Sequence, residues 1–297
     1  MATAAAWSIG QKAALACVLE VTARKPGNVH PWAPRTDLSY VDFLVSAQAL
    51  VEPLNRIAEL GLGRAVLECV RATRKVVNTN TNLGIILLFC PLALAAVHRG
   101  NRSLGEVLKG LLRETTVRDS EYVFEAIRLA EPGGLDRVDE EDVSQQPTRP
   151  LRDVMILAGD RDAIAWQYAS DYEDVQLLRD TLAQELQKEH RTWEQAIICS
   201  YLFGLSRWRD SLILRKYGTR LAEQVSRKAS DVLRHGWPDS ARGIELFCFF
   251  DKWLRKQDPP LNPGTTADLV AGAILWLLIE EPELLVTKFR QPLVLSS

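Results

Sequence analysis

Apolar residues recur every three or four positions along most of the chain, which is the spacing of one face of an α-helix. These faces predict twelve helices between residues 8 and 280, and the longest are expected over residues 39–59 and 153–172. No segment alternates convincingly as a strand does, and residues 284–295 are the one doubtful case. The pattern predicts an all-α fold, a single globular domain over residues 1–297 with about eleven or twelve helices.

A long loop is expected near residues 131–150. This segment contains three prolines, the pair Gly133-Gly134 and the acidic run 139–142. The acidic run resembles a diphosphate–metal motif, but no apolar helical frame carries it. We therefore interpret it as a solvated loop.

Composition narrows the class of protein. With 36 basic and 38 acidic side chains, the net charge of −2 argues against a general nucleic-acid binder. The five cysteines show no CxxC spacing, which is typical of reduced thiols in a cytoplasmic protein. The most apolar stretch, residues 83–97, contains a proline and falls short of the ~20 residues that a membrane span needs. We expect a cytoplasmic protein with this stretch as a core helix.

The first candidate site lies where the first predicted helix ends, near Arg24. Pro26-Gly27 turns the chain directly after Lys25, so the backbone N–H of Gly27 and the ammonium of Lys25 could bind a phosphate. The alternative is a structural helix end, in which Lys25 complements the helix dipole and Gly27 stops the helix.

Two more polar turns each precede a strongly apolar helix. The first, Asn78-Thr-Asn-Thr-Asn-Leu-Gly84, would place amides at a helix N-terminus, where an anion can bind; the alternative is a capping structure. The second is Asn262-Pro-Gly-Thr-Thr-Ala-Asp268. Its Asp268 could complement the dipole or hold Mg²⁺ beside phosphates, and the sequence leaves both readings open.

Charged clusters at Asp160–Asp162 and Asp210–Lys216 are typical of surface ion pairs, although either could contribute to a site. The four histidines have no metal-ligand spacing, and the chain contains no Walker A, GxGxxG, GxSxG or kinase signature.

Taken in order, these motifs resemble the triphosphoribosyl-dephospho-CoA synthase family. They are Glu20, Lys25-Pro-Gly-Asn28, Asn80-Thr-Asn-Leu-Gly84 and Pro263-Gly-Thr-Thr-Ala-Asp-Leu269, with Asp210–Lys216 as a fourth block. The resemblance implies an all-helical transferase that moves a 5-triphosphoribosyl group from ATP to 3′-dephospho-CoA and releases adenine. The chain departs from the family where Asn82-Leu83 replaces the usual His-Lys.

The resemblance also implies roles for individual residues. Glu20, Asp162 and Asp268 are the candidate catalytic carboxylates, and Asp268 and Asp162 are the candidate ligands of an Mg²⁺ that accompanies ATP. The candidate substrate- and phosphate-binding residues are Lys25, Gly27, Asn28, Asn80, Thr81, Asn82, Arg215, Lys216, Gly264 and Thr265. We expect the three turns to line one cleft, and loss of Lys25 to weaken Mg·ATP binding with little effect on the melting temperature.

Two other functions stay open at this point. The chain could transfer an α-ribosyl phosphate to a different hydroxyl acceptor, in the synthesis of a pterin-type C1-carrier cofactor. It could also be a non-catalytic helical nucleotide-binding protein. The expected partners are ATP and dephospho-CoA or another hydroxyl acceptor, without nucleic acid or membrane. A homodimer is left open by the sequence.

Overall fold

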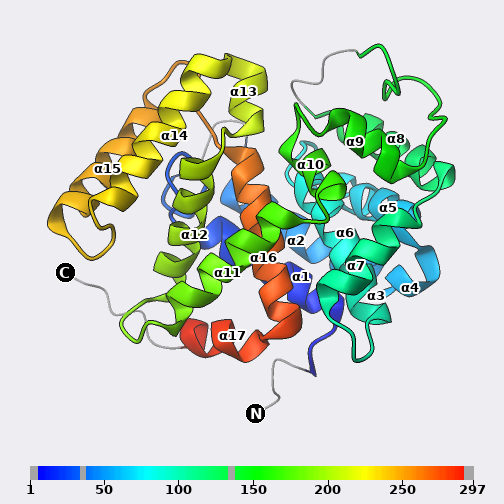
Figure 1. Ribbon diagram of the computed structural model, residues 1–297, viewed down its shortest axis with the longest axis horizontal. Coiled ribbons are helices and arrows are strands. Elements are labelled where there is room, and N and C mark those ends of the chain that lie inside the picture. Colours follow the sequence, from blue (N-terminus) through cyan, green and yellow to red (C-terminus); the bar gives the residue numbers. More distant parts are fainter. Residues whose placement is uncertain (1–5, 34–37, 133–137, 291–297) are drawn as a thin grey trace. The chain divides into compact units, whose positions relative to one another are not determined.

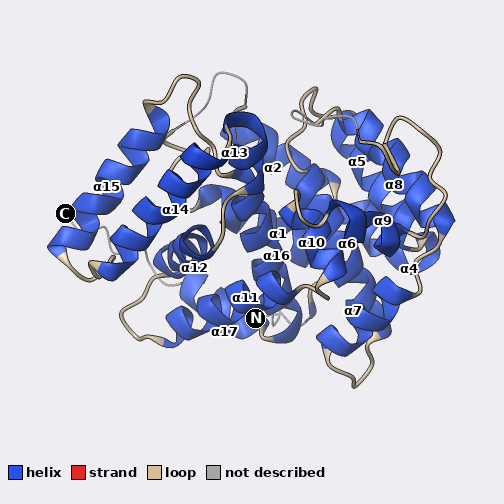
Figure 2. Ribbon diagram, turned by 45° about the horizontal axis from the view of Figure 1, so that its top comes forward, coloured by secondary structure: helices blue, strands red, loops and turns tan. Residues whose placement is uncertain are grey.

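The computed structural model describes residues 6–33, 38–132 and 138–290. These residues form seventeen helices, and their one bridge pairs His30 with Ala33. Figures 1 and 2 show helices joined by loops, with no strand among the described residues. The all-α prediction is confirmed, whereas the expected count of eleven or twelve helices is too low. None of the described helices has both the length and the apolar character that crossing a membrane requires.

The chain divides into two compact units. The terminal unit contains residues 6–7, Leu19–Ala33 and residues 174–290, and the central unit contains Ser8–Val18 and the described part of residues 34–173. Helix α1 (Ile9–Thr22) contributes to both. The central unit holds α2 (Tyr40–Ala49), α3 (Val51–Asn55), α4 (Ile57–Leu60), α5 (Leu62–Arg74), α6 (Leu83–His98), α7 (Leu104–Arg113), α8 (Val117–Ala130), α9 (Leu151–Ala158) and α10 (Ala163–Ala169). The terminal unit holds α11 (Glu173–Gln187), α12 (Trp193–Arg207), α13 (Ser211–Tyr217), α14 (Thr219–Arg234), α15 (Ala241–Arg255), α16 (Gly264–Glu280) and α17 (Pro282–Arg290). The single domain over residues 1–297 stays a prediction, and these two units are the compact parts within it.

Breaks in two expected helices explain most of the difference in count. Residues 39–59 form α2, α3 and α4, because Pro53 lacks the N–H that would bond to the carbonyl of Ala49. Residues 153–172 form α9 and α10, which are separated at Asp162, whose backbone is extended. Residues 282–290 form α17, so the doubtful strand was wrong for its described part. The described part of the expected loop, residues 138–150, contains no helix, as predicted.

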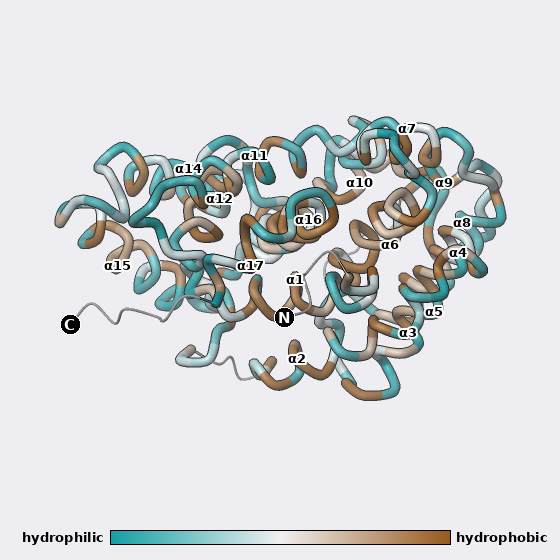
Figure 3. Tube along the Cα trace, turned by 90° about the horizontal axis from the view of Figure 1, so that it is seen from below, coloured by the Kyte–Doolittle hydropathy of each residue, from teal (hydrophilic) through white to brown (hydrophobic). Residues whose placement is uncertain are grey.

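The core of the central unit is α6. Its residues are apolar on all sides and almost all buried, and they are brown in Figure 3. Helices α5 and α7 pack on it, and α8 packs on α5. Pro91 lies inside α6 and cannot donate to the carbonyl of Leu87. The buried Tyr168 supplies the missing donor, because its hydroxyl donates to Leu87 O at 2.6 Å.

The core of the terminal unit is α16, in which fourteen of seventeen residues are buried, so it is enclosed on every side. Helices α12, α13 and α17 pack against it. Helices α14 and α15 lie side by side, and α14 also packs on α12. The polar turns of residues 25–28 and 262–264 both belong to this unit.

Candidate functional site

Lys25 folds back onto the end of α1 and does not reach solvent. Its side chain is fully buried, and its ammonium lies 2.9 Å from Glu20 Oε1. The same ammonium donates to the backbone carbonyls of Glu20 and Ala23, so all three of its protons have acceptors. The structure therefore shows the structural helix end that the sequence offered as an alternative. Phosphate binding by Lys25 stays a prediction.

The turn after Lys25 is held from several sides. Gly27 has φ +80°, and a Cβ there would lie 2.9 Å from a Leu254 methyl group, so glycine is required. Its N–H, expected to be open to a phosphate, donates to Asp251 Oδ1 at 2.9 Å. Arg255 donates to the carbonyl of Asn28 at 2.9 Å, and the buried hydroxyl of Tyr201 donates to that of Pro26. The turn is therefore rigid.

The turns of residues 25–28 and 262–264 touch each other. Asn28 Nδ2 donates to Asn262 Oδ1 at 2.7 Å and to the carbonyl of Pro263 at 3.4 Å. Two of the three turns that were expected to share a cleft are therefore in contact. The other side-chain atom, Asn28 Oδ1, is buried and has no hydrogen-bond partner. It is an acceptor that a ligand N–H or O–H could satisfy.

Asp210 joins the fourth sequence block to the start of α16. Its Oδ2 accepts from the backbone N–H and the hydroxyl of Thr266, both at 2.8 Å, and its Oδ1 accepts from Ile213 N. Burial raises the pKa of Asp210, and the hydrogen bonds from Thr266 and Ile213 oppose that rise. Beside it, Ser211 donates to Thr265 Oγ1 at 3.1 Å. Asp210 is therefore a buried structural residue and not part of a surface ion pair, because its hydrogen bonds fix the first turn of α16 on α13.

The turn of residues 78–82 lies in the central unit. Asn80 Oδ1 accepts from Leu83 N at 3.1 Å and thereby caps α6, as the capping alternative proposed. Thr81 bonds to Ser46 on α2 at 2.6 Å, and Asn82 donates to Thr73 on α5 at 3.3 Å. Asn80, Thr81 and Asn82 therefore each have a structural use. Whether this turn shares a cleft with the other two stays a prediction.

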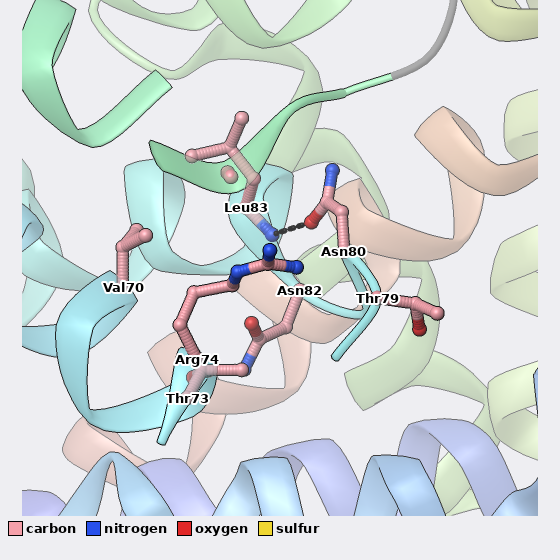
Figure 4. A pocket seen from close by; sticks show the side chains of 8 residues that line it. Val70, Thr73, Arg74, Thr79, Asn80, Asn82 and Leu83 are labelled. Carbon is pink, nitrogen blue, oxygen red and sulfur yellow. Dashed lines mark hydrogen bonds between the residues drawn. The ribbon is translucent and has the colours of Figure 1, made fainter. Parts of the chain in front are cut away.

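A pocket opens beside this turn, at the start of α6. Figure 4 shows the side chains that line it, which include Arg74, Thr79, Asn80 and Asn82. Arg74 ends α5, donates to the carbonyl of Asn78 at 2.5 Å and is partly exposed. Arg74 is not among the site residues that the sequence motifs predicted. The signal was a basic residue in the last turn of the helix that precedes the polar turn.

The candidate carboxylates have different surroundings. Glu20 is paired with Lys25, and Asp162 Oδ1 caps α10 by accepting from Ile164 N and Ala165 N. Asp268 lies half-buried in the first turns of α16. Asp162 belongs to the central unit and the other two to the terminal unit. Their catalytic roles stay predictions.

The cationic candidates of the terminal unit lie on α13. Arg215 is half-buried, Lys216 is exposed, and both are in the last turn of that helix. Gly264 begins α16, and a Cβ there would lie 2.9 Å from a methyl group of Leu212, so a larger residue would disturb the contact between α13 and α16.

The sequence profile of the CitG family, described as ATP:dephospho-CoA triphosphoribosyl transferase, matches residues 6–286. The chain belongs to this family. It is also similar to a crystal structure from Archaeoglobus fulgidus, proposed to be a triphosphoribosyl-dephospho-CoA synthase. That chain is 26% identical, the match covers 80% of the present chain and 99% of the other, and the TM-score is 0.62. None of the curated proteins matches the chain.

Membership of the CitG family confirms the resemblance that the ordered motifs suggested. The chain is a transferase, and the activity of its family is triphosphoribosyl transfer from ATP to dephospho-CoA. The two other functions that the sequence left open are not needed to explain these findings.

Proposed function

We propose that this chain transfers the 5-triphosphoribosyl group of ATP to a hydroxyl of 3′-dephospho-CoA. The observation that carries the proposal is the family match over residues 6–286, within which the sequence motifs occur in order. In this reaction the acceptor oxygen forms a bond to C1′ of the ribose while the bond from C1′ to adenine N9 breaks. The acceptor hydroxyl loses its proton, adenine leaves with a proton, and the triphosphate stays on the transferred ribose.

Each compact unit offers one feature that suits a part of this work. The pocket at the start of α6 is small, about 10 Å³, and we place a single phosphate oxygen there, since Arg74 and the positive end of a buried helix dipole lie beside it. In this arrangement Arg74 supplies the cation that the family usually has at the position of Leu83. The joined turns of residues 25–28 and 262–264 offer Asn28 Oδ1 as a fixed acceptor for a ligand donor.

Mg²⁺ would enter as the counter-ion of ATP. The described residues contain no group of three histidine, cysteine, aspartate or glutamate side chains that could hold a metal ion. Mg²⁺ commonly keeps several waters and binds through substrate phosphates with one or two carboxylates. We place Asp268 in this limited role, because it lies half-buried in the first turns of α16 within the motif of residues 263–269. Asp162 caps α10, where its Oδ1 accepts two backbone N–H groups. The ion would supply charge neutralisation at the triphosphate.

The direct test follows adenine and the transferred ribose together. Purified protein is incubated with ATP and dephospho-CoA, free adenine is quantified by chromatography, and the product is identified by mass. We expect one adenine released per dephospho-CoA consumed, and loss of both signals when EDTA removes Mg²⁺. Reactions without dephospho-CoA, or with a sugar-alcohol acceptor in its place, are the controls. Absence of adenine release with every acceptor would refute the proposed function.

A further inference from the structure

Trp32 is the most exposed large hydrophobic side chain among the described residues, at 72%. Its backbone is nevertheless fixed. Residues 30–33 form a tight turn in which Ala33 N donates to the carbonyl of His30 at 2.9 Å, and Trp32 N donates to His30 Nδ1 at 3.3 Å. His30 itself is buried. The turn therefore displays the indole ring outward from an anchored backbone.

The guanidinium of Arg24 lies over the Trp32 ring. The centre of its guanidinium lies 5.7 Å from the centroid of the Trp32 ring. The guanidinium is clamped by Glu194 of α12 through Nε to Oε1 at 2.7 Å and Nη2 to Oε2 at 2.6 Å. Because Glu194 is buried and neutralises it, Arg24 serves as a fixed flat support for the indole, and the exposed area of Trp32 is left for another planar group.

The charged groups around the turn are balanced. Burial, together with the positive charges of Arg255, Lys25 and Arg24, lowers the pKa of His30 to about 4, against the opposing effect of Asp251. The imidazole is therefore neutral near neutral pH. Each of the three cations has a carboxylate partner, Glu194 for Arg24, Glu20 for Lys25 and Asp251 for Arg255. Because these charges are paired, the flat aromatic face of a purine suits the exposed indole.

We propose that the exposed face of Trp32 stacks on the adenine ring of a substrate nucleotide. The proposal rests on the proposed function, because ATP and dephospho-CoA both carry adenine. Trp32 lies four residues after Asn28, so the platform continues the turn that is joined to residues 262–264. Stacking of a base on an aromatic side chain is sequence-tolerant and strong enough to be measured by substitution.

The test compares ligands with and without the base by calorimetric titration. ATP is paired with inorganic tripolyphosphate, and dephospho-CoA with 4′-phosphopantetheine. We expect Trp32→Ala to weaken binding of at least one adenine ligand by at least about fivefold and to leave its base-free partner unchanged. Trp32→Phe should retain most of the affinity. Trp166→Leu, which removes a partly exposed indole from α10, is the matched control and should bind like the wild type.

The outcomes of this test distinguish the stacking proposal from the proposed transferase reaction. The ligand whose affinity falls identifies which adenine is stacked. Unchanged affinity of Trp32→Ala for both adenine ligands, or an equal loss for the base-free partners, would overturn the stacking proposal and leave the transferase reaction standing. If Trp32→Ala loses affinity only for an adenine ligand, and the wild-type protein releases no adenine, the result would support the stacking proposal and refute the transferase reaction. A wild type that binds neither adenine ligand would overturn the platform as well.

Discussion

At the scale of single residues, burial changes what a side chain of known type can do. Lys25 belongs to a sequence motif and was expected to meet a phosphate, yet its ammonium is enclosed with Glu20 and two helix carbonyls. A charge removed from water is costly unless it is paired and hydrogen-bonded, so this lysine and its glutamate depend on each other. The expectation that its loss would leave the melting temperature nearly unchanged was based on an exposed helix-end lysine and has to be corrected.

We predict that Lys25→Ala lowers the free energy of unfolding by about 3–5 kcal/mol, because it leaves Glu20 as an unpaired buried charge. Urea denaturation of the variant and the wild type measures this difference. Lys216→Ala removes an exposed lysine from α13 and should change stability by no more than about 0.5 kcal/mol. Equal stability of the two variants would contradict the buried ion pair.

His30 gives a pH-dependent prediction. Its pKa in the folded protein is about 4, below the ordinary 6.5, so the unfolded chain takes up the proton first as the pH falls. The contribution of the neutral His30 to the free energy of unfolding is therefore complete above about pH 6.5, and it is lost as the pH falls toward 4. His30→Gln should show a smaller loss of unfolding free energy between about pH 7 and about pH 5 than the wild type. The exposed His235, replaced by glutamine, serves as the control, and an identical pH slope in His30→Gln would count against a buried neutral imidazole.

At the scale of elements, two features of α6 depend on residues that neighbouring helices supply. Pro91 removes a hydrogen bond from α6, and Tyr168 of α10 replaces it at Leu87 O. At the start of the same helix, Arg74 from α5 lies beside the pocket formed with the polar turn. One contact maintains the core of the central unit, and the other provides a cation at the positive end of a helix.

Tyr168→Phe should lower the free energy of unfolding by about 1 kcal/mol, because the carbonyl of Leu87 then loses its short hydrogen bond and keeps only the longer one from Tyr172 at 3.4 Å. In a Pro91→Ala background the restored N–H can bond to Leu87, so the same substitution should cost less. A double-mutant cycle by urea denaturation gives the coupling between the two positions. Additive effects would mean that the tyrosine hydroxyl does not compensate for the proline.

Arg74→Met should weaken Mg·ATP binding about tenfold or more, which is the usual effect of losing one charge-assisted hydrogen bond to phosphate. Lys75→Met removes the same charge from the next, exposed position and should bind ATP like the wild type. Calorimetric titration of both variants separates a specific contact from general attraction. If both lose affinity equally, Arg74 has no special place in the site.

At the scale of the whole molecule, the helices form two compact units, each built around one apolar helix, α6 or α16. A ligand that binds only the folded chain stabilises it by an amount set by its concentration and affinity. We expect Mg·ATP at about ten times its Kd to add about 1.4 kcal/mol, which corresponds to a rise of a few degrees in Tm. Differential scanning fluorimetry measures the rise, with pyrimidine nucleotides as controls. An equal rise with CTP would show that the adenine base is not recognised.

The sequence by itself determined the fold class, the positions of most helices and the two core helices. These depend on local periodicity and capping, and helices as apolar as α6 and α16 can only be buried. It also determined the family, because the motifs occur in order over most of the chain. The breaks at Pro53 and Asp162, by contrast, were not assigned from periodicity, since the apolar spacing continues across them.

Only the tertiary structure decided what the motif residues touch. Lys25 turns inward to Glu20, and Asp210 holds the first turn of α16. Arg74, at the end of α5, lines the pocket, and Arg24, just after α1, lies over the Trp32 ring. The contact of Asp210 with Thr266 joins residues far apart in the sequence, whereas the other three are local. Even there, the choice between solvent and the interior depends on which helices cover the turn, and that follows from packing of the whole unit and not from local spacing.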